Sequence, residues 1–88
     1  MKHYETRILL YWTEGQLARG WTDSDHDSDD PMGLAEEAKA RMLRMRAAGQ
    51  MPTQAEGLTW TEVEHGAVQV YGYGMGHHET PVAEVGLF

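Results

Sequence analysis

The sequence contains no cysteine, so neither a disulfide framework nor a thiolate metal site can stabilise the fold. Its 88 residues suffice for one domain. A chain of this length buries only about two-thirds of the surface that its unfolded form exposes, so its stability depends on one modest core. A homodimer would be the other way to bury more surface, and that alternative stays open.

Long apolar runs are also missing. No stretch approaches the roughly 20 apolar residues that a membrane-spanning helix needs. The opening residues 1–5, Met-Lys-His-Tyr-Glu, lack the apolar segment of a signal peptide. We therefore expect a cytoplasmic protein that does not associate with a membrane.

Nucleophiles are scarce. Besides the absence of cysteine, the only serines are Ser24 and Ser28, and both lie within an acidic stretch. A domain this small also offers little concave surface in which the pKa of a catalytic group could be shifted. The sequence predicts a binding protein that is not an enzyme and needs no cofactor.

Positive charge is absent from the second half of the chain. Fourteen acidic residues face seven basic ones, giving a net charge of −7, and every Lys and Arg precedes position 47. This balance argues against direct binding to nucleic acid or anionic lipid. It predicts a partner with a basic surface.

What is present begins with a predicted β-hairpin. The segment Arg7–Trp21 is rich in strand-forming residues and is interrupted at Glu14-Gly15, where glycine can adopt the positive φ of a tight turn. A bulge at Gly15 would shift the register by one residue. The predicted cross-strand pairs are Ile8 with Trp21 and Trp12 with Leu17.

A polar stretch and a helix follow. Residues 22–30 include no apolar side chain and are predicted to form a loop. Asp30 is a suitable N-cap and Pro31 a suitable first residue for a helix over Pro31–Ala48, with Gly49 as its stop. The apolar face of this helix comprises Leu34, Ala35, Ala38, Met42 and Met45.

A second hairpin is predicted over Leu58–Tyr73, with its turn at His65-Gly66 and Gly66 at positive φ. Residues 81–88 are predicted to return as a short last strand. The fold class is therefore α+β, a single domain over residues 1–88 ordered ββα-ββ(β), with one helix packed on an antiparallel sheet. The predicted pairs of the second hairpin are Val63 with Val68, Thr61 with Val70 and Trp60 with Tyr71.

The acidic stretch allows a metal interpretation as an alternative. Acidic residues occupy positions 1, 3, 5 and 12 of a calcium-loop template, namely Asp25, Asp27, Asp29 and Glu36. Position 6 of the template requires glycine but holds Asp30, and no helix precedes the loop. A solvated acidic loop that ends in a helix cap is the interpretation we favour.

The adjacent His77 and His78 suggest a zinc site, but neighbouring residues of a strand point to opposite faces, so the two could not both bind one zinc ion from regular β structure. We therefore interpret them as exposed loop residues.

The Arg7–Trp21 hairpin, the Asp23–Asp30 run and the Pro31–Ala48 helix together resemble small phage-encoded inhibitors of bacterial defence, including the anti-CRISPR proteins. The size and acidity are also similar to those of small antitoxin and immunity domains. The resemblance implies binding by electrostatic mimicry, in which carboxylates stand where nucleic-acid phosphates would sit on a basic groove.

These observations predict a small acidic, inhibitor-like protein that occupies a basic surface of a larger protein or nucleoprotein complex, and whether that surface also binds nucleic acid stays open. The alternative is a calcium-responsive module. The candidate partner-binding residues are Asp23, Asp25, Asp27, Asp29, Asp30, Glu62, Glu64 and Glu84.

Overall fold

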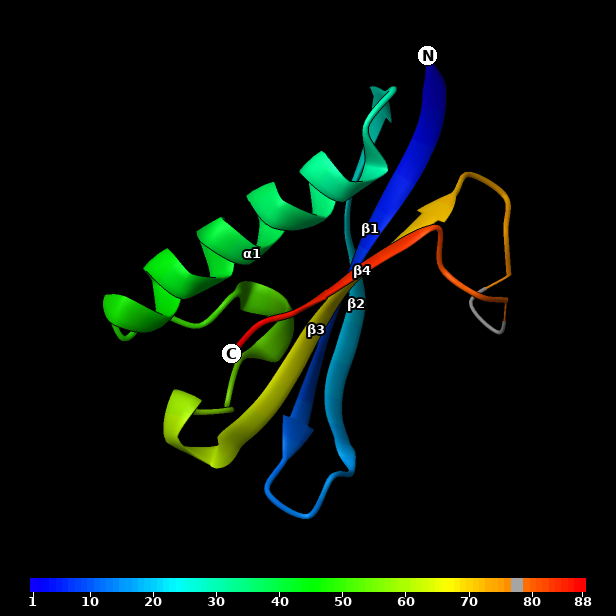
Figure 1. The fold of residues 1–88 in the computed structure, drawn as a ribbon. Helices are drawn as coiled ribbons and strands as arrows, with labels where there is room; N and C mark the ends of the chain where they lie inside the picture. Colours follow the sequence, from blue (N-terminus) through cyan, green and yellow to red (C-terminus); the bar gives the residue numbers. More distant parts are fainter. Residues whose placement is uncertain (77–78) are drawn as a thin grey trace.

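Strand β1 (Lys2–Trp12) lies at the centre of a four-stranded antiparallel sheet in the computed structural model, which describes residues 1–76 and 79–88 (Figure 1). The strand order is β2-β1-β3-β4, and one helix packs on one face of the sheet. This arrangement confirms the predicted α+β class. The other elements are β2 (Leu17–Ser28), α1 (Pro31–Ala47), β3 (Val63–Gly72), β4 (Ala83–Gly86) and two 3₁₀ turns (Thr53–Ala55 and Trp60–Glu62).

The first hairpin forms as predicted, with Gly15 at a φ of 85° in its turn. Ile8 pairs with Trp21, as the sequence indicated, but Leu17 lies opposite Tyr11 and not opposite Trp12. The register shifts because Ala18 is an extra residue between two pairs, which is the geometry of a β-bulge. The bulge therefore lies inside the strand and not in the turn.

The prediction that residues 22–30 form a loop is wrong for most of this range, because β2 continues to Ser28. The N-terminal half of β1 reaches back to Lys2 and pairs with residues 24–28, forming backbone hydrogen bonds with alternate residues among them. A run of polar side chains is compatible with this strand because β2 lies at the edge of the sheet, where water solvates one face and one edge. A second register shift next to Thr6 leaves Asp23 as the extra residue.

The predicted second hairpin is also wrong. Residues 63–72 form one uninterrupted strand that pairs with β1 on one side and with β4 on the other. Gly66 is therefore inside a strand, and it does not have a positive φ. None of the three predicted pairs forms, and residues 60–62 are a 3₁₀ turn that leads into β3. The sheet obtains its third strand from a long-range pairing with β1, which no local pattern in the sequence reveals.

The helix is close to its prediction. The Asp30 carboxylate accepts a hydrogen bond from the backbone N–H of Gly33 at 3.0 Å, and Pro31 is the first helical residue. Gly49, at a φ of 69°, follows the C-terminal end. Helix α1 contacts mainly β3 and β4. Its buried residues are Ala35, Ala38 and Met42, while Leu34 and Met45 are partly buried against the same core.

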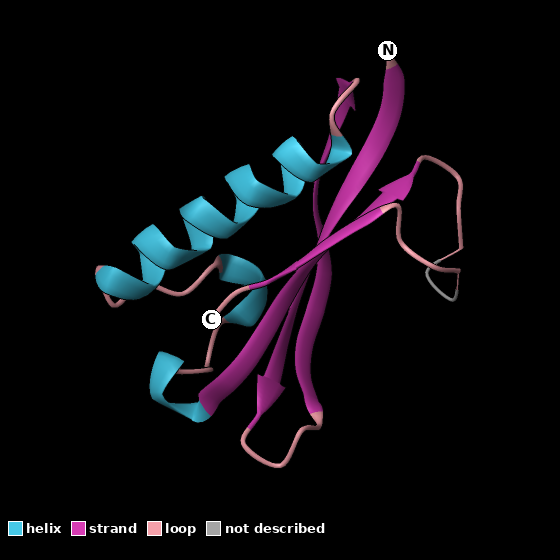
Figure 2. Cartoon of the chain, viewed as in Figure 1, coloured by secondary structure: helices cyan, strands magenta, loops and turns pink. Residues whose placement is uncertain are grey.

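The core lies between the helix and the sheet, and no helix of the described residues covers the opposite face of the sheet (Figure 2). Side chains alternate along β1, so that Thr6, Ile8 and Leu10 point toward the core. The intervening residues of β1, including His3, belong to the other side. We call this second side of the sheet the open face. No helix among the described residues is long and apolar enough to cross a bilayer.

The predicted last strand is confirmed as β4, and it continues into an ordered tail. Leu87 is buried, and its backbone N–H donates to the carbonyl of Gly66 at 2.9 Å. The Phe88 ring packs edge-on against Trp60 and lies 4.3 Å from the guanidinium of Arg46. The tail thereby joins the helix to the beginning of β3.

Candidate functional site: the acidic edge of β2

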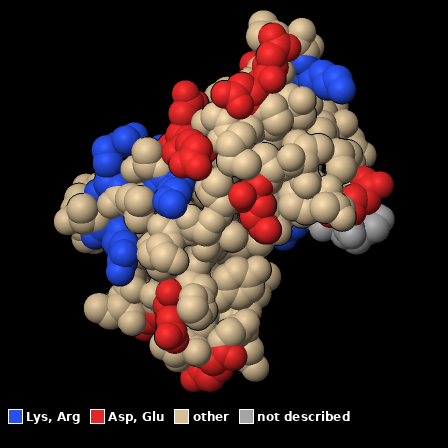
Figure 3. Space-filling view, in the orientation of Figure 1, with Lys and Arg blue, Asp and Glu red and all other residues tan. Residues whose placement is uncertain are grey.

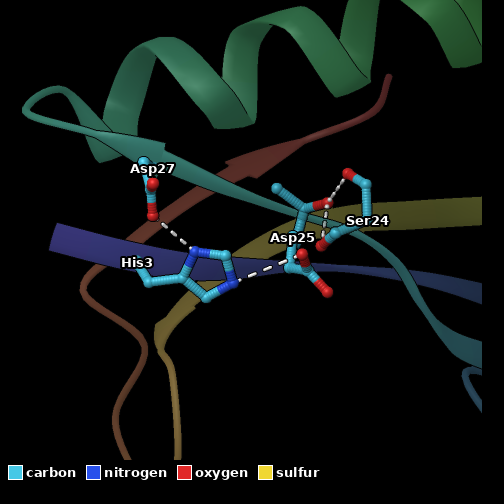
Figure 4. A network of polar contacts seen from close by, with 5 residues as sticks. His3, Ser24, Asp25 and Asp27 are labelled. Atoms are coloured by element: carbon cyan, nitrogen blue, oxygen red, sulfur yellow. Dashed lines mark hydrogen bonds and ion pairs between the residues drawn. The ribbon is translucent and has the colours of Figure 1, made fainter.

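Two exposed aspartates of β2 flank one histidine of β1 on the open face (Figure 4). The Nδ1 atom of His3 lies 2.6 Å from an Oδ1 of Asp27, and its Nε2 atom lies 3.3 Å from an Oδ1 of Asp25. Asp25 and Asp27 share a face because side chains alternate along a strand, which places them about 6.8 Å apart along it. The hairpin register sets the ring between them, because His3 is paired with Asp27.

This geometry favours a charged imidazole. A neutral imidazole has one donor and one acceptor nitrogen, whereas both nitrogens donate in the imidazolium form. Both ring nitrogens of His3 face carboxylate oxygens, so only the protonated ring can donate to both. The hydrogen bond with Asp27 is the main cause that raises the pKa of His3. Desolvation is the next largest effect and opposes it, while the charges of Asp27 and Asp25 and the hydrogen bond with Asp25 each raise the pKa by less.

The carboxylates of this cluster remain accessible to a partner. The side chains of Asp25 and Asp27 are 59% and 65% exposed, while that of Asp29 is 81% exposed and lies 3.7 Å from the N-terminal ammonium. We call Asp25, Asp27 and Asp29 the acidic edge. Behind it, on the core side of the sheet, Thr6 and Ser24 are joined by a hydrogen bond of 2.7 Å between their hydroxyl groups.

The other two aspartates of the run have roles inside the fold. Asp23, the extra residue at the bulge, pairs with Arg41 of α1, and its side chain is only 15% exposed. Asp30 caps the helix. The predicted set of five aspartates therefore divides into three exposed residues and two that are engaged by the helix.

The three candidate glutamates do not join the acidic edge. Glu62 accepts a hydrogen bond from the Thr59 hydroxyl, and Glu84 accepts one from the Gln69 side chain at 2.6 Å. Glu62 and the exposed Glu64 flank Val63, which pairs with Trp12 at the end of β1 far from His3. Figure 3 accordingly shows acidic residues in several separate groups, with most of the visible basic residues over the helix.

The calcium interpretation depended on a loop, and the structure has a strand there. Asp25 and Asp27 belong to β2, while Glu36 is exposed on α1. Within residues 1–76 and 79–88, no three His, Cys, Asp or Glu side chains converge in a way that could hold a metal ion. His77 and His78 lie outside the described residues.

Sequence reasoning missed His3 and Arg41, the two side chains that pair with aspartates of this region. The hairpin register contained a signal for the first, because extending the pairing of Ile8 with Trp21 toward the N-terminus brings position 3 to the aspartate run. Arg41 had no such signal, because it depends on where the helix crosses the sheet. The described part of the chain contains no detectable pocket. No protein family model, curated protein or solved structure matches the chain.

Proposed function

We propose that the protein is a non-enzymatic binding protein that occupies a basic surface of a larger protein or nucleoprotein complex and inhibits it by doing so. The acidic edge of β2 is the contact surface. The observation that supports this proposal is the exposure of three carboxylates on and just beyond the edge strand β2, whose cationic partners within residues 1–76 and 79–88 are a histidine and the N-terminal ammonium.

Exposed carboxylates are well suited to this task. They are accessible to an approaching basic groove, and regular strand geometry holds two of them at a fixed spacing. The net charge of −7 adds a long-range attraction that accelerates encounter with a basic partner. A groove that normally holds phosphates would respond to the same charges, so the proposal includes mimicry of nucleic acid by a phage-type inhibitor.

The decisive experiment compares two triple variants in capture from a host lysate, followed by measurement of association and dissociation rates for the retained partner. In the first variant Asp25, Asp27 and Asp29 become asparagine. In the second Glu14, Glu37 and Glu56, which are exposed elsewhere, become glutamine. Both variants lose three negative charges, so only the position of the charge differs.

We expect association of the aspartate variant to be about tenfold slower at low salt, because steering by nearby charges is lost, and the glutamate variant to stay closer to the parent. The difference should shrink at high salt, because the Debye length falls from about 10 Å at 0.1 M to about 3 Å at 1 M. Equal rates for the two variants would show that the acidic edge is not the contact surface.

A further inference from the structure

The backbone N–H and C=O groups of Asp25 and Asp27 point away from β1, toward the outer edge of the sheet. His3 of β1 accepts a hydrogen bond from the N–H of Tyr73, which lies just beyond the end of β3, so the backbone polar groups of His3 face β3. In an antiparallel ladder these groups alternate in direction along the strand, so those of Glu5 face β3 as well. The residues opposite them on β2 are Asp27 and Asp25. Their N–H and C=O groups must therefore point to the outer edge of β2.

That outer edge carries no strand among the described residues, because β2 is the last strand of the order β2-β1-β3-β4. The bulge at Asp23 breaks the regular edge on one side, and the helix cap at Asp30 limits it on the other. Between them, residues 24–28 form a regular, solvated strand edge. Exposed edges of this kind pair readily with an added strand.

We infer that residues 24–28 accept an extended segment of the partner as a fifth strand, and that this segment carries Lys or Arg at alternate positions. The inference rests on the proposed function, because it specifies how the acidic edge would engage its basic partner. The outward backbone groups of Asp25 and Asp27 supply the hydrogen bonds. Their carboxylates select the side chains of the segment.

Strand geometry dictates the alternate spacing. In an antiparallel added strand, a residue directly opposite Asp25 or Asp27 would form a hydrogen-bonded pair with it, with about 5.5 Å between the two Cα atoms. The side chain of that residue would lie on the same open face as the aspartate. A basic side chain at each of these two positions would face a carboxylate from the outside, while His3 faces it from the inside. Each carboxylate has enough lone pairs for both contacts.

The same charges disfavour pairing with a second copy of this chain. Two β2 edges related by a two-fold axis at His26 would place Asp25 of one copy opposite Asp27 of the other. Like charges directly opposite one another destabilise a strand pair. Acidic side chains on an edge strand thus discourage self-association and favour a basic strand.

The test uses the whole chain and three synthetic peptides with alternating Lys and Thr. One peptide is unmodified, one is N-methylated on the Lys amides, and one is N-methylated on the Thr amides. All three have the same charge. When the Lys side chains lie over Asp25 and Asp27, the Lys amides face β2 and the Thr amides face solvent. Affinity is measured by calorimetry, and the binding position is read from the NMR shifts of the Asp25 and Asp27 amides.

We expect methylation of the Lys amides to weaken binding about tenfold relative to methylation of the Thr amides, because only the former removes hydrogen bonds to the edge. The amide signals of Asp25 and Asp27 should shift and become protected from exchange. Equal affinities for the two methylated peptides, shifts located elsewhere or no binding of the unmodified peptide would each overturn strand addition.

These failures are distinguishable from failure of the proposed function. Suppose that the lysate partner associates more slowly with the aspartate variant, but that the two methylated peptides bind with equal affinity. The protein would then recognise charge without accepting an added strand. A partner whose association rate is the same for the two triple variants would instead remove the acidic edge from the contact surface.

Discussion

The Cδ1 atom of Leu87 lies 2.5 Å from the point at which a Cβ would stand on Gly66. The same point is 3.1 Å from the backbone oxygen of Leu9. Glycine is thus required here by the close approach of a buried side chain and not by a turn. The contact is structurally central, because Leu87 is 1% exposed and closes the core behind β3 and β4.

Replacing Gly66 with alanine should destabilise the fold by about 1–3 kcal/mol, because the added methyl group overpacks the core at Leu87. Chemical denaturation measures the free energy of unfolding directly. Gly86→Ala is the matched control, since a Cβ at that position meets nothing within 4 Å. Equal effects of the two substitutions would contradict the role assigned to Leu87.

Ala38 sets the distance between the helix and the sheet. It is 2% exposed and lies on the face of α1 that packs against the core. Ala38→Leu should cost about 1–3 kcal/mol through overpacking, whereas Ala40→Leu on the exposed side of the helix should change stability by less than about 0.5 kcal/mol. Thermal unfolding of both variants checks this, and an unchanged melting temperature for Ala38→Leu would show that the helix packs elsewhere.

The pair between Asp23 and Arg41 ties the helix to the edge strand. A double-mutant cycle with Asp23→Asn and Arg41→Gln should give a coupling of about 1 kcal/mol, because one partner is largely buried and the other is half-exposed. Arg44→Gln replaces Arg41→Gln in the control cycle, because no ion pair of Arg44 is found among the described residues. A coupling near zero in the first cycle would show that the pair adds nothing to stability.

His3 should make the β1–β2 end of the sheet sensitive to pH. Its pKa is raised above the usual 6.5, so the protonated ring is stabilised in the folded state. The contribution of these contacts to stability is therefore fully present below about pH 6.5 and is lost as pH rises through the higher folded-state pKa. An NMR titration of the His3 ring measures that pKa.

Asp27→Asn should lower the pKa of His3 toward its usual value, because the largest cause of the shift is removed. Asp29→Asn is the control, since Asp29 lies beside the N-terminal ammonium and makes no described contact with His3. If the two variants shift the titration of His3 equally, general acidity of the region and not the Asp27 contact sets the pKa.

The first hairpin and the helix could be predicted because their signals are local. Gly15 marks the turn, Asp30 with Pro31 marks the start of the helix, and apolar spacing marks its buried face. The β3 strand could not be predicted, because its partners are distant and its interior glycine resembles a turn. Gly66 is present because Leu87 lies against it, and this contact requires knowledge of the tertiary fold.

The candidate site was predictable in composition but not in form. The aspartates were identified as candidate binding residues from their charge alone. Their polar character indicated a loop, whereas Asp25 and Asp27 lie in strand β2. An edge strand needs only one hydrogen-bonded neighbour, and the N-terminal half of β1 provides it. The division between exposed Asp25 and engaged Asp23 follows from a single extra residue at the bulge, which reverses the side to which the next side chain points.

The central position of β1 also constrains the order of folding. Ile8 is paired with Trp21 on one side and with Val68, sixty residues away in sequence, on the other. The β1–β2 hairpin can form early, because its contacts are near in sequence. β1 gains its second neighbour, β3, only after the long chain segment between β1 and β3 has closed into a loop. Until β3 is paired, the edge of β1 that will receive it is an unpaired strand edge with apolar side chains, which is the kind of edge that pairs readily with another chain.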